Sequence, residues 1–326
     1  MMTKIAAVTG ATGFVGKHLI NELIAQGFQV NALTRRPRPE KEKPKKEKPE
    51  KEKINWISGD LDNRQALGEL VKNTDVVFHL AGLVKARSKH DFNHINSHAV
   101  KTLVDVIHQS ATKPHAKPHF ILLSSLAARE RKLSAYAESK RKGEEILTEH
   151  AGDMPWTILR PPGVYGPEDK ETLKIFKAVS YRMSILPGSA DNRASWIYAP
   201  DLARALIAVS ENQACHDQIL DVDDGKKDGY SNQEMYETAA NILNINAFNI
   251  VLPRFILRFF GHINVLFSTL FGYIPMITPE KVNELCHSDW ICRGPHVMKL
   301  TNWKPETTLK QGFKKTLKWY RDNNLM

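Results

Sequence analysis

A tyrosine and a lysine stand one helical turn apart in this sequence, at Tyr136 and Lys140. Residues i and i+4 share one face of a helix, so the ammonium group of Lys140 is expected to lie close to the phenol of Tyr136. A phenol has a pKa of about 10 and is a poor base at neutral pH, but a nearby positive charge favours the phenolate. The pair therefore predicts an acid–base centre in which Lys140 activates Tyr136.

Ser125 is the third residue of this group. It follows an apolar run at 120–123 that predicts a buried strand, and α/β folds place their ligands at the carboxyl ends of such strands. A hydroxyl at that point can hold a substrate oxygen near Tyr136. The order and context of Ser125, Tyr136 and Lys140 favour a catalytic trio over a surface tyrosine and lysine.

A glycine-rich turn near the N-terminus predicts a dinucleotide-binding site. It follows the apolar run 4–8 and precedes 14–26, where the apolar residues have helical spacing. Gly10 permits a tight turn, Gly13 lets a pyrophosphate approach the backbone, and Gly16 lets the helix pack closely on the strand. Free N–H groups at the start of the helix would bind the phosphates. The expected cofactor-binding residues of this turn are Gly10, Thr12, Gly13, Phe14, Val15 and Gly16.

Strands and helices alternate along the first half of the chain. The expected strands are 4–8, 28–33, 54–57, 76–80, 120–123 and 156–159, and the expected helices are 14–26, 63–71, 96–109 and 134–150. Continuous apolar strands are typical of a parallel sheet that is buried on both faces. The pattern predicts an α/β fold with a Rossmann-like, doubly wound parallel sheet.

The pattern changes near residue 165 and predicts two parts. Residues 1–165 are expected to form the dinucleotide-binding Rossmann domain. Within it, the Lys/Glu/Pro-rich stretch 38–53 cannot bury apolar area and predicts a charged loop insertion. Residues 166–326 are less regular and are expected to form a smaller substrate-binding lobe, with some elements returning to the main domain. The elements expected there are helices at 201–210, 232–243 and 309–320 and a strand at 219–222.

Taken in order, these motifs resemble the extended short-chain dehydrogenases/reductases, the NAD-dependent epimerase/dehydratase family. The turn at 9–16 resembles the TGxxGxxG motif of that family, and 159–167 is similar to its R-P-x-x-V-Y-G-P stretch beside the nicotinamide. Ser125, Tyr136 and Lys140 match its catalytic positions. Asn96 looks like the asparagine of its central helix and is taken as a fourth catalytic residue. The resemblance implies cofactor contacts at Asp60, Leu61, Leu80, Ala81, Gly82, Tyr136, Lys140, Pro161 and Val164.

Two arginines, Arg35 and Arg36, follow the second expected strand. An NAD enzyme usually has an acidic residue near this point to hold the ribose 2′-hydroxyl, whereas arginine suits the 2′-phosphate of NADP. Arg35 is the first candidate and Arg36 the second, and the alternative is that both are solvated loop charges. The sequence therefore predicts NADP in preference to NAD.

Several reactions fit this cofactor and trio. Dehydratases of the family typically have an Asp-Glu pair directly after the catalytic hydroxyl residue, but here no carboxylate follows Ser125 until Glu130. Nucleotide-sugar epimerases tend to carry an arginine just before the strand at 195–198, and Arg193 is a candidate substrate contact one position out of register. Hydride transfer between a carbonyl and an alcohol is the first expectation, epimerisation the alternative, and a non-catalytic cofactor-binding scaffold the second alternative.

The segment 251–277 is unusually apolar and leaves three interpretations open. Its uncharged run after His262 is shorter than the ~20 residues that a membrane-spanning helix needs. The first expectation is that the segment forms core helices of the smaller lobe. The second is an apolar lid over a hydrophobic substrate. The third is a helix in a membrane interface, a peripheral contact that the basic charge would help.

The composition limits the partners. A net charge of +10 can attract anionic ligands or acidic membranes, but without a zinc-finger spacing or a basic reading helix the sequence predicts no nucleic-acid partner. Three cysteines without framework or metal-site spacing argue against a disulfide scaffold and favour a cytoplasmic location. The histidines at 90, 94 and 98 share a helix face that is expected to be solvated, so no metal is predicted. A small-molecule substrate is expected. A homodimer is implied by family members that pair through the helices holding Asn96 and Tyr136.

Overall fold

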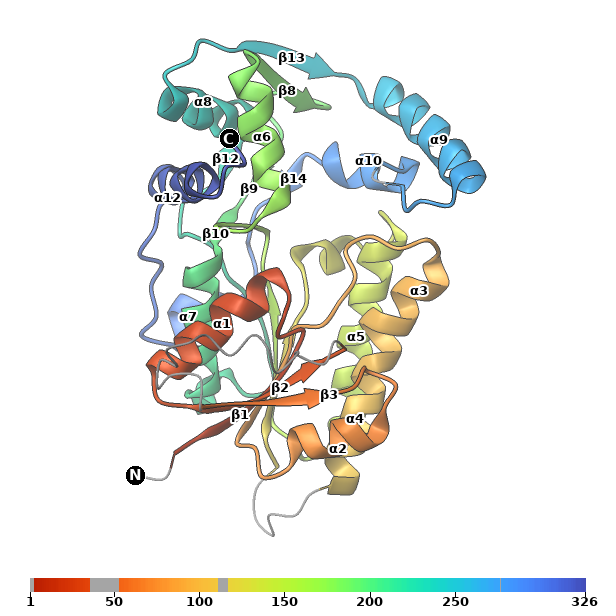
Figure 1. The fold of residues 1–326 in the computed structure, drawn as a ribbon, viewed down its shortest axis with the longest axis vertical. Coiled ribbons are helices and arrows are strands. Elements are labelled where there is room, and N and C mark those ends of the chain that lie inside the picture. The colour runs from red at the N-terminus through yellow and green to blue at the C-terminus, as the bar shows by residue number, and fades with distance from the viewer. Residues whose placement is uncertain (1–2, 36–52, 111–116, 276) are drawn as a thin grey trace.

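The computed structural model describes residues 3–35, 53–110, 117–275 and 277–326. Arg36 and nearly all of the charged loop expected at 38–53 lie outside the described residues. Figure 1 shows a larger lobe built on a sheet and a smaller lobe that continues from one end of it.

A seven-stranded sheet forms the centre of the larger lobe. Its order is β11-β6-β5-β4-β1-β2-β3, and every neighbouring pair is parallel. The strands are β1 (Ile5–Thr9), β2 (Gln29–Thr34), β3 (Ile54–Ser58), β4 (Val76–His79), β5 (His119–Leu123), β6 (Trp156–Arg160) and β11 (Gln218–Asp221). The predicted doubly wound parallel sheet is confirmed. The strand order reverses beside β1, and in such sheets ligands bind beyond the carboxyl ends of the strands at this point.

Helices cover both faces of this sheet (Figure 1). α1 (Phe14–Ala25) and α7 (Ala199–Ser210) pack together on one face, and α2 (Arg64–Val71), α4 (Ala99–Ser110) and α5 (Ala135–His150) cover the other. β4 and β5 are buried along their whole length because helices lie above and below them. Each large apolar side chain buried in these layers stabilises the fold by about 2 kcal/mol.

The smaller lobe is built around a cluster of aromatic side chains. Phe313 lies 5.2 Å from Tyr165 and 5.3 Å from Phe176 between ring centres, and both contacts are edge-on. A Cβ atom on Gly312 would lie 2.2 Å from the Tyr165 hydroxyl, so only glycine allows this approach. The elements around the lobe are β7 (Gly163–Tyr165), α6 (Lys170–Ser180), β8 (Met183–Pro187), β9 (Arg193–Ala194), β10 (Trp196–Tyr198), β12 (Tyr230–Ser231), α8 (Asn232–Leu243), β13 (Phe248–Leu252), α9 (Arg254–Phe271), α10 (Pro279–Leu285), β14 (Asp289–Trp290) and α12 (Leu309–Asp322). The short helix α11 (Val297–Leu300) returns to the larger lobe, where Val297 joins the core of the sheet.

The helix expected at 96–109 begins earlier and is not uniform. α3 (Lys89–Asn93) leads into a π-helical turn, η3 (His94–His98), before α4 begins. Asn96 lies in this turn, and its side chain exchanges hydrogen bonds of 2.8 and 3.0 Å with the backbone of Leu83. Such turns widen a helix locally and are frequent at functional sites.

The expectation that 251–277 forms core helices is wrong. Within α9 only Leu257 and Gly261 are buried, whereas the side chain of Phe255 is 73% exposed. The helix touches the rest of the lobe mainly through α10, because Gly261 lets the two cross closely: a Cβ atom there would lie 3.1 Å from the nitrogen of Pro279. In the part of the chain that the structure describes, no helix is both long and apolar enough to cross a membrane.

A buried ion pair fastens α5 to β6. The side chain of Glu144 is 2% exposed and that of Arg160 14%, and the Arg160 guanidinium donates two hydrogen bonds to the Glu144 carboxylate, the one from Nε measuring 2.9 Å. The Ser124 hydroxyl donates a third hydrogen bond of 2.5 Å to the same carboxylate. These bonds offset the free energy that burying the two charged groups costs, so removing either charge would leave the other buried without a counter-charge.

We expect Glu144→Gln to lower the free energy of unfolding by roughly 3–5 kcal/mol, because it leaves the Arg160 guanidinium buried without a counter-charge. Urea denaturation followed by circular dichroism measures this loss. Glu145→Gln is the matched control, since the side chain of Glu145 is 35% exposed and pairs with Arg141 at the surface. The control should cost less than about 1 kcal/mol. Equal losses in the two variants would contradict the assignment.

Two histidines of the sheet are buried in the neutral form. Burial, aided by the charge of Lys140, lowers the pKa of His79 to about 3. Burial, aided by His216, lowers the pKa of His119 to about 4. An unfolded histidine has a pKa of about 6.5, so the unfolded chain binds more protons than the folded chain below that pH. The stability that these neutral histidines contribute is therefore fully present above about pH 6.5. It is lost as the pH falls toward the folded-state pKa values, about 4 for His119 and about 3 for His79.

We expect a change from neutral pH to about pH 5 to remove about 2 kcal/mol of unfolding free energy for each of these two histidines. Unfolding midpoints measured across that range test the expectation. His79→Gln should reduce the loss of unfolding free energy between neutral pH and pH 5 by about 2 kcal/mol, the contribution of one histidine. His90→Gln, on the exposed side of α3, should leave the loss unchanged. A pH dependence that is the same in wild type and His79→Gln argues against a buried neutral His79.

Candidate active site

The start of α5 places the expected catalytic side chains. Ser134 caps the helix: its hydroxyl accepts a hydrogen bond of 3.0 Å from the nitrogen of Ala137. Tyr136 and Lys140 follow on one face, which is turned toward the carboxyl end of β5. Ser125 lies directly beyond that strand, at the start of the short 3₁₀ helix η4 (Leu126–Glu130). The expected trio is therefore brought together by β5 and α5.

Tyr136 is part-buried, and hydrogen bonding by the nearby Ser125 side chain influences the pKa of its phenol. The ring of Phe92 packs 6.0 Å from its ring. Burial raises the pKa of Tyr136 to about 12, the bond with Ser125 acts in the opposite direction, and the charge of Glu284 adds to the rise. The phenol is therefore protonated at neutral pH.

Lys140 is buried, and its ammonium group donates a hydrogen bond of 2.9 Å to the carbonyl oxygen of Leu123 at the end of β5. Burial lowers the pKa of Lys140 to about 8, although the charge of Glu144 opposes the fall. The sequence predicts that Lys140 lowers the pKa of Tyr136, and here the structure differs. Desolvation is the largest influence on both groups, and it favours the uncharged form of each.

The loop after β4 lies against Lys140. A Cβ atom on Gly82 would lie 3.1 Å from the Lys140 ammonium nitrogen and 3.1 Å from the side-chain oxygen of Asn96, so a larger residue would crowd both. The Asn96 amide also donates a hydrogen bond of 2.9 Å to the Ser139 hydroxyl. Its polar atoms are thus used in joining the loop, η3 and α5, which suits a positioning role for Asn96.

Gly143 is a residue that sequence reasoning missed. A Cβ atom there would lie 2.3 Å from the carbonyl oxygen of Asn96. Only glycine lets α5 approach η3 this closely. The sequence carries no signal for this contact, because a glycine inside a helix pattern does not reveal which backbone it meets.

The glycine turn lies between β1 and the loop after β4. Gly10 has a φ of +70°, which an L side chain rarely adopts, and a Cβ atom there would lie 2.6 Å from the nitrogen of Ala81. A Cβ atom on Gly16 would lie 2.1 Å from the carbonyl oxygen of Gly10. Both glycines are required for the turn to fit, as the sequence predicts.

The first turn of α1 has the character of a phosphate site. Its N-cap is Gly13, no side chain caps it, and no acidic residue lies in the first turn. Helices α5, α6, α8 and α12, by contrast, begin with a Ser, Asp or Thr side chain that accepts a backbone hydrogen bond. Uncapped N–H groups at the positive end of a helix dipole bind anions. This turn and the glycine cradle fit the pyrophosphate of a dinucleotide.

The other expected cofactor residues lie around this edge of the sheet. Arg35 is exposed directly after β2. Asp60 accepts hydrogen bonds of 3.0 Å from the backbone nitrogens of Asp62 and Asn63 and so shapes the turn after β3. Further expected residues are Thr12, Phe14 and Val15 in the turn and at the start of α1, Leu61 after β3, Leu80 after β4, Pro161 after β6, and Val164 in β7.

Arg193 makes its contacts within the smaller lobe. Its guanidinium donates hydrogen bonds of 2.7 Å to the carbonyl oxygen of Asp228 and 3.1 Å to that of Gly229. It also lies 3.4 Å from the carboxylate of Glu234. These contacts join β9 to the region around β12.

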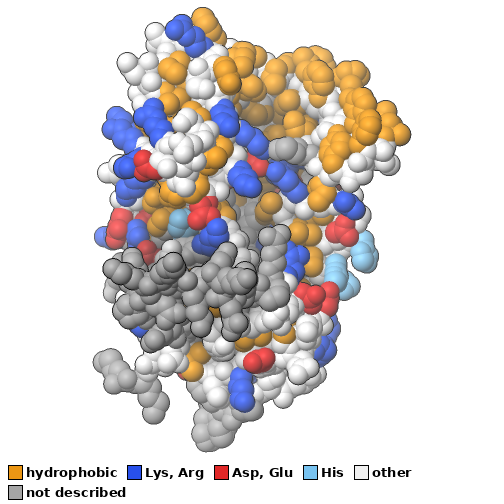
Figure 2. Space-filling model, in the orientation of Figure 1, with side chains coloured by type: hydrophobic (Ala, Val, Ile, Leu, Met, Phe, Trp, Pro, Cys, Tyr) orange, Lys and Arg blue, Asp and Glu red, His pale blue; other side chains and the backbone are white. Residues whose placement is uncertain are grey.

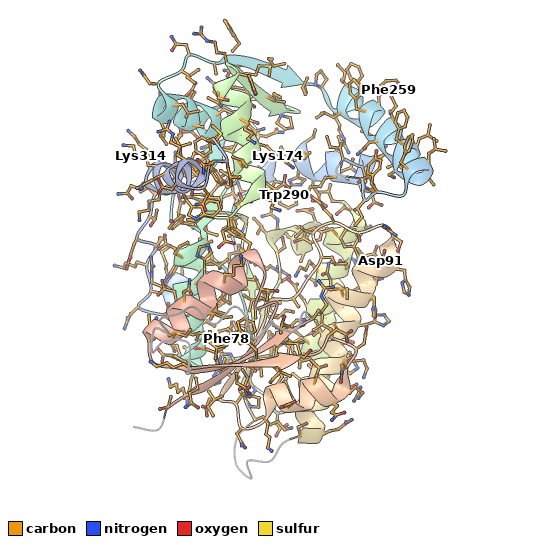
Figure 3. All side chains as sticks on the ribbon, viewed as in Figure 1. Phe78, Asp91, Lys174, Phe259, Trp290 and Lys314 are labelled. Atoms are coloured by element: carbon orange, nitrogen blue, oxygen red, sulfur yellow. The ribbon has the colours of Figure 1, made fainter. Side chains whose placement is uncertain are left out.

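Two carboxylates of α10 reach the start of α5, and sequence reasoning missed both. Glu280 accepts a hydrogen bond of 2.8 Å from the nitrogen of Ala135, and Glu284 accepts one of 2.5 Å from the Ser134 hydroxyl. Trp290, labelled in Figure 3 where the two lobes meet, donates its ring N–H to the carbonyl oxygen of Glu284 at 2.8 Å. The partners are 145 and 150 residues apart in the chain, so no local pattern could reveal them.

Comparison with known proteins finds a matching family model and relatives that align over almost the whole chain. The model of the NAD dependent epimerase/dehydratase family matches residues 6–222. A ceramide reductase from Caulobacter vibrioides is 33% identical over 97% of this chain and 94% of its own length. A decarboxylating sterol-4-alpha-carboxylate 3-dehydrogenase from Candida albicans is 22% identical, with 97% of each chain covered.

Solved structures share the fold over almost the whole chain. A UDP-glucuronic acid 4-epimerase from Bacillus cereus in complex with NAD has a TM-score of 0.71 at 19% identity, covering 98% of this chain and 99% of its own. A UDP-glucose 4-epimerase from Thermotoga maritima has a TM-score of 0.73 at 17% identity, covering 99% and 100%. At these identities the likeness concerns the fold alone. Together with the family match and the relative at 33% identity, the expected resemblance is confirmed: the chain belongs to the NAD-dependent epimerase/dehydratase family of extended short-chain dehydrogenases/reductases.

Proposed function

We propose that this chain is an NADP(H)-dependent oxidoreductase that interconverts a carbonyl and an alcohol on a hydrophobic, lipid-like substrate. The observation that carries the proposal is that buried Lys140 of α5 bonds the last carbonyl of β5, with Tyr136 on the same helix face and Ser125 directly beyond that strand. A nicotinamide, when bound, supplies or accepts the hydride.

The residues of the chain manage the proton. During reduction, Ser125 holds the carbonyl oxygen of the substrate and the Tyr136 phenol donates its proton to that oxygen. Lys140, one turn along α5, stabilises the phenolate that remains until solvent returns the proton. During oxidation the same phenolate accepts the proton of the substrate hydroxyl.

The ionisation of the site favours the reducing direction. Because burial raises the pKa of Tyr136 to about 12, the phenol is a proton donor at neutral pH. The Lys140 pKa of about 8 keeps most of its ammonium charged there. A protonated phenol beside a charged ammonium suits proton delivery to a carbonyl oxygen.

The proposed substrate class rests on the relatives and on the smaller lobe. Among the relatives that match almost the full chain, one is named for ceramide and another for a sterol carboxylate, and both are lipids. Apolar side chains are abundant in β13 and α9, and α10 links α9 to the start of α5. Nucleotide-sugar epimerisation has less support, because the guanidinium of Arg193 is already bonded within the lobe.

We expect Tyr136→Phe to lower turnover by about 10²-fold or more, because it removes the proton donor. Affinity for NADPH should stay nearly the same, because the glycine turn and the first turn of α1 would hold the dinucleotide phosphates. Loss of NADPH absorbance with a long-chain ketone measures turnover, and fluorescence titration measures binding. Tyr181→Phe, at a tyrosine that is 75% exposed, is the control and should retain full activity. Near-normal turnover in Tyr136→Phe would remove the basis of the assignment.

We expect NADPH to bind more tightly than NADH, and Arg35→Ser to weaken NADPH by about tenfold or more while NADH affinity hardly changes. A charge-assisted hydrogen bond to the 2′-phosphate is worth about 1.5–3 kcal/mol, and NADH lacks that group. Titration of both dinucleotides measures the ratio, with Arg321→Ser in α12 as the control. A wild-type protein that binds NADH more tightly than NADPH would refute the cofactor assignment.

A further inference from the structure

One side of α9 carries large apolar side chains that nothing in the described chain covers. Phe255, Phe259, Leu266 and Leu270 recur at helical spacing and are between 61% and 73% exposed. They lie opposite the Leu257 side that packs on α10. Figure 2 shows hydrophobic side chains gathered over this end of the molecule, and Figure 3 shows Phe259 among those that project outward from the helix. Isolated exposed apolar residues are common, but a continuous apolar surface marks a contact site.

The charges beside this surface have one sign. Arg254, Arg258 and His262 recur every four residues and form a stripe along one flank of the apolar side. The sequence contains no Asp or Glu between residues 238 and 279. A helix with an apolar side, a basic flank and no acidic residue has the pattern of helices that lie in the interface of an anionic membrane.

We propose that α9 docks on the surface of an anionic lipid bilayer, with its apolar side, defined by Phe255, Phe259, Leu266 and Leu270, inserted among the lipids. The basic stripe of Arg254 and Arg258 then faces the negatively charged headgroups. The helix lies along the surface, because its exposed apolar side extends from Phe255 to Leu270, over almost its whole length.

A second copy of this chain suits the surface less well than a bilayer. A two-fold interface sets the same patch against itself, so it would bring two basic stripes together in a protein with a net charge of +10. No carboxylate of the segment could compensate that repulsion. Anionic headgroups provide the complementary charge directly.

Two sets of contacts join α9 to the part of the molecule that holds Tyr136, and their bearing on catalysis rests on the proposed function. Arg87, in the segment between β4 and α3, donates a hydrogen bond of 3.3 Å to the carbonyl oxygen of Gly272 at the end of α9. The other attachment is α10, whose Glu280 and Glu284 bind the start of α5. α9 is therefore joined through α10 to the start of α5, the helix that holds Tyr136, so docking would bring this lobe to the bilayer that contains a lipid ketone.

Vesicle co-sedimentation of the full chain tests the docking without dinucleotide or substrate. We expect binding to phosphatidylcholine vesicles that contain about one third phosphatidylglycerol, and weaker binding at high salt or without the anionic lipid. The double substitution Phe255→Ser and Phe259→Ser should weaken binding by about tenfold or more, because two large apolar side chains no longer insert. Arg258→Glu should weaken it several-fold. Leu325→Ser, at an exposed leucine of the C-terminus, is the matched control and should bind as wild type does.

Either of two vesicle results overturns the proposal. One is wild-type protein that stays in the supernatant with anionic vesicles. The other is equal binding by wild type and the Phe255/Phe259 variant while circular dichroism shows both folded. Light scattering tests the rival occupant: a wild-type dimer that the double substitution converts to monomers assigns α9 to a second copy instead. Vesicle binding with no turnover of any ketone sinks the proposed function alone, and turnover with no vesicle binding sinks the docking alone.

Discussion

The packing of α5 against the carboxyl ends of β5 and β6 is the constraint on which the site depends. Lys140 bonds the last carbonyl of β5, Gly143 meets the carbonyl of Asn96, and Glu144 pairs with Arg160 of β6. These residues lie on one helix face, where a shift of a single position would break all three contacts at once. The sheet thus sets the depth and rotation of Tyr136 through backbone and charge contacts. Because Ser125 follows β5 itself, the hydroxyl and the phenol are fixed by the same strand.

Burial decides the ionisation of Tyr136 and Lys140. It acts against the expectation that the charge of Lys140 lowers the pKa of Tyr136. The ammonium of Lys140 is close in sequence to the phenol, yet desolvation is the largest influence on both and moves each toward its neutral form. At neutral pH this leaves a protonated phenol and a mostly charged amine. The pKa of Lys140, about 8, is nearer to neutral pH than that of Tyr136, about 12. A small change in pH or in local charge therefore changes the protonation of Lys140 more than that of Tyr136. In the proposed reaction Tyr136 is therefore a proton donor at neutral pH.

Local patterns predicted the sheet, the glycine turn and the helix face shared by Tyr136 and Lys140 well, because each depends on neighbours in sequence. Apolar runs marked the strands, the spacing of Gly10, Gly13 and Gly16 marked the turn, and the interval between Tyr136 and Lys140 marked a shared helix face. Contacts between distant parts of the chain could not be predicted in this way. Glu280 capping α5 and the closeness of Gly143 to η3 depend on which elements meet. The exposure of α9 was mispredicted for a related reason: apolar composition indicates that a surface needs cover, but not whether protein supplies it.

The attachment of α10 joins the smaller lobe to the helix that carries Tyr136 and Lys140. Glu280 and Glu284 occupy the end of α5 where Tyr136 lies, and the charge of Glu284 adds to the rise in the pKa of that phenol. α10 in turn is the main support of α9. A displacement of the two helices would remove hydrogen bonds from Ser134 and Ala135, which begin α5. The acidity of Tyr136 is thus tied through two successive contacts to the position of the apolar helix α9.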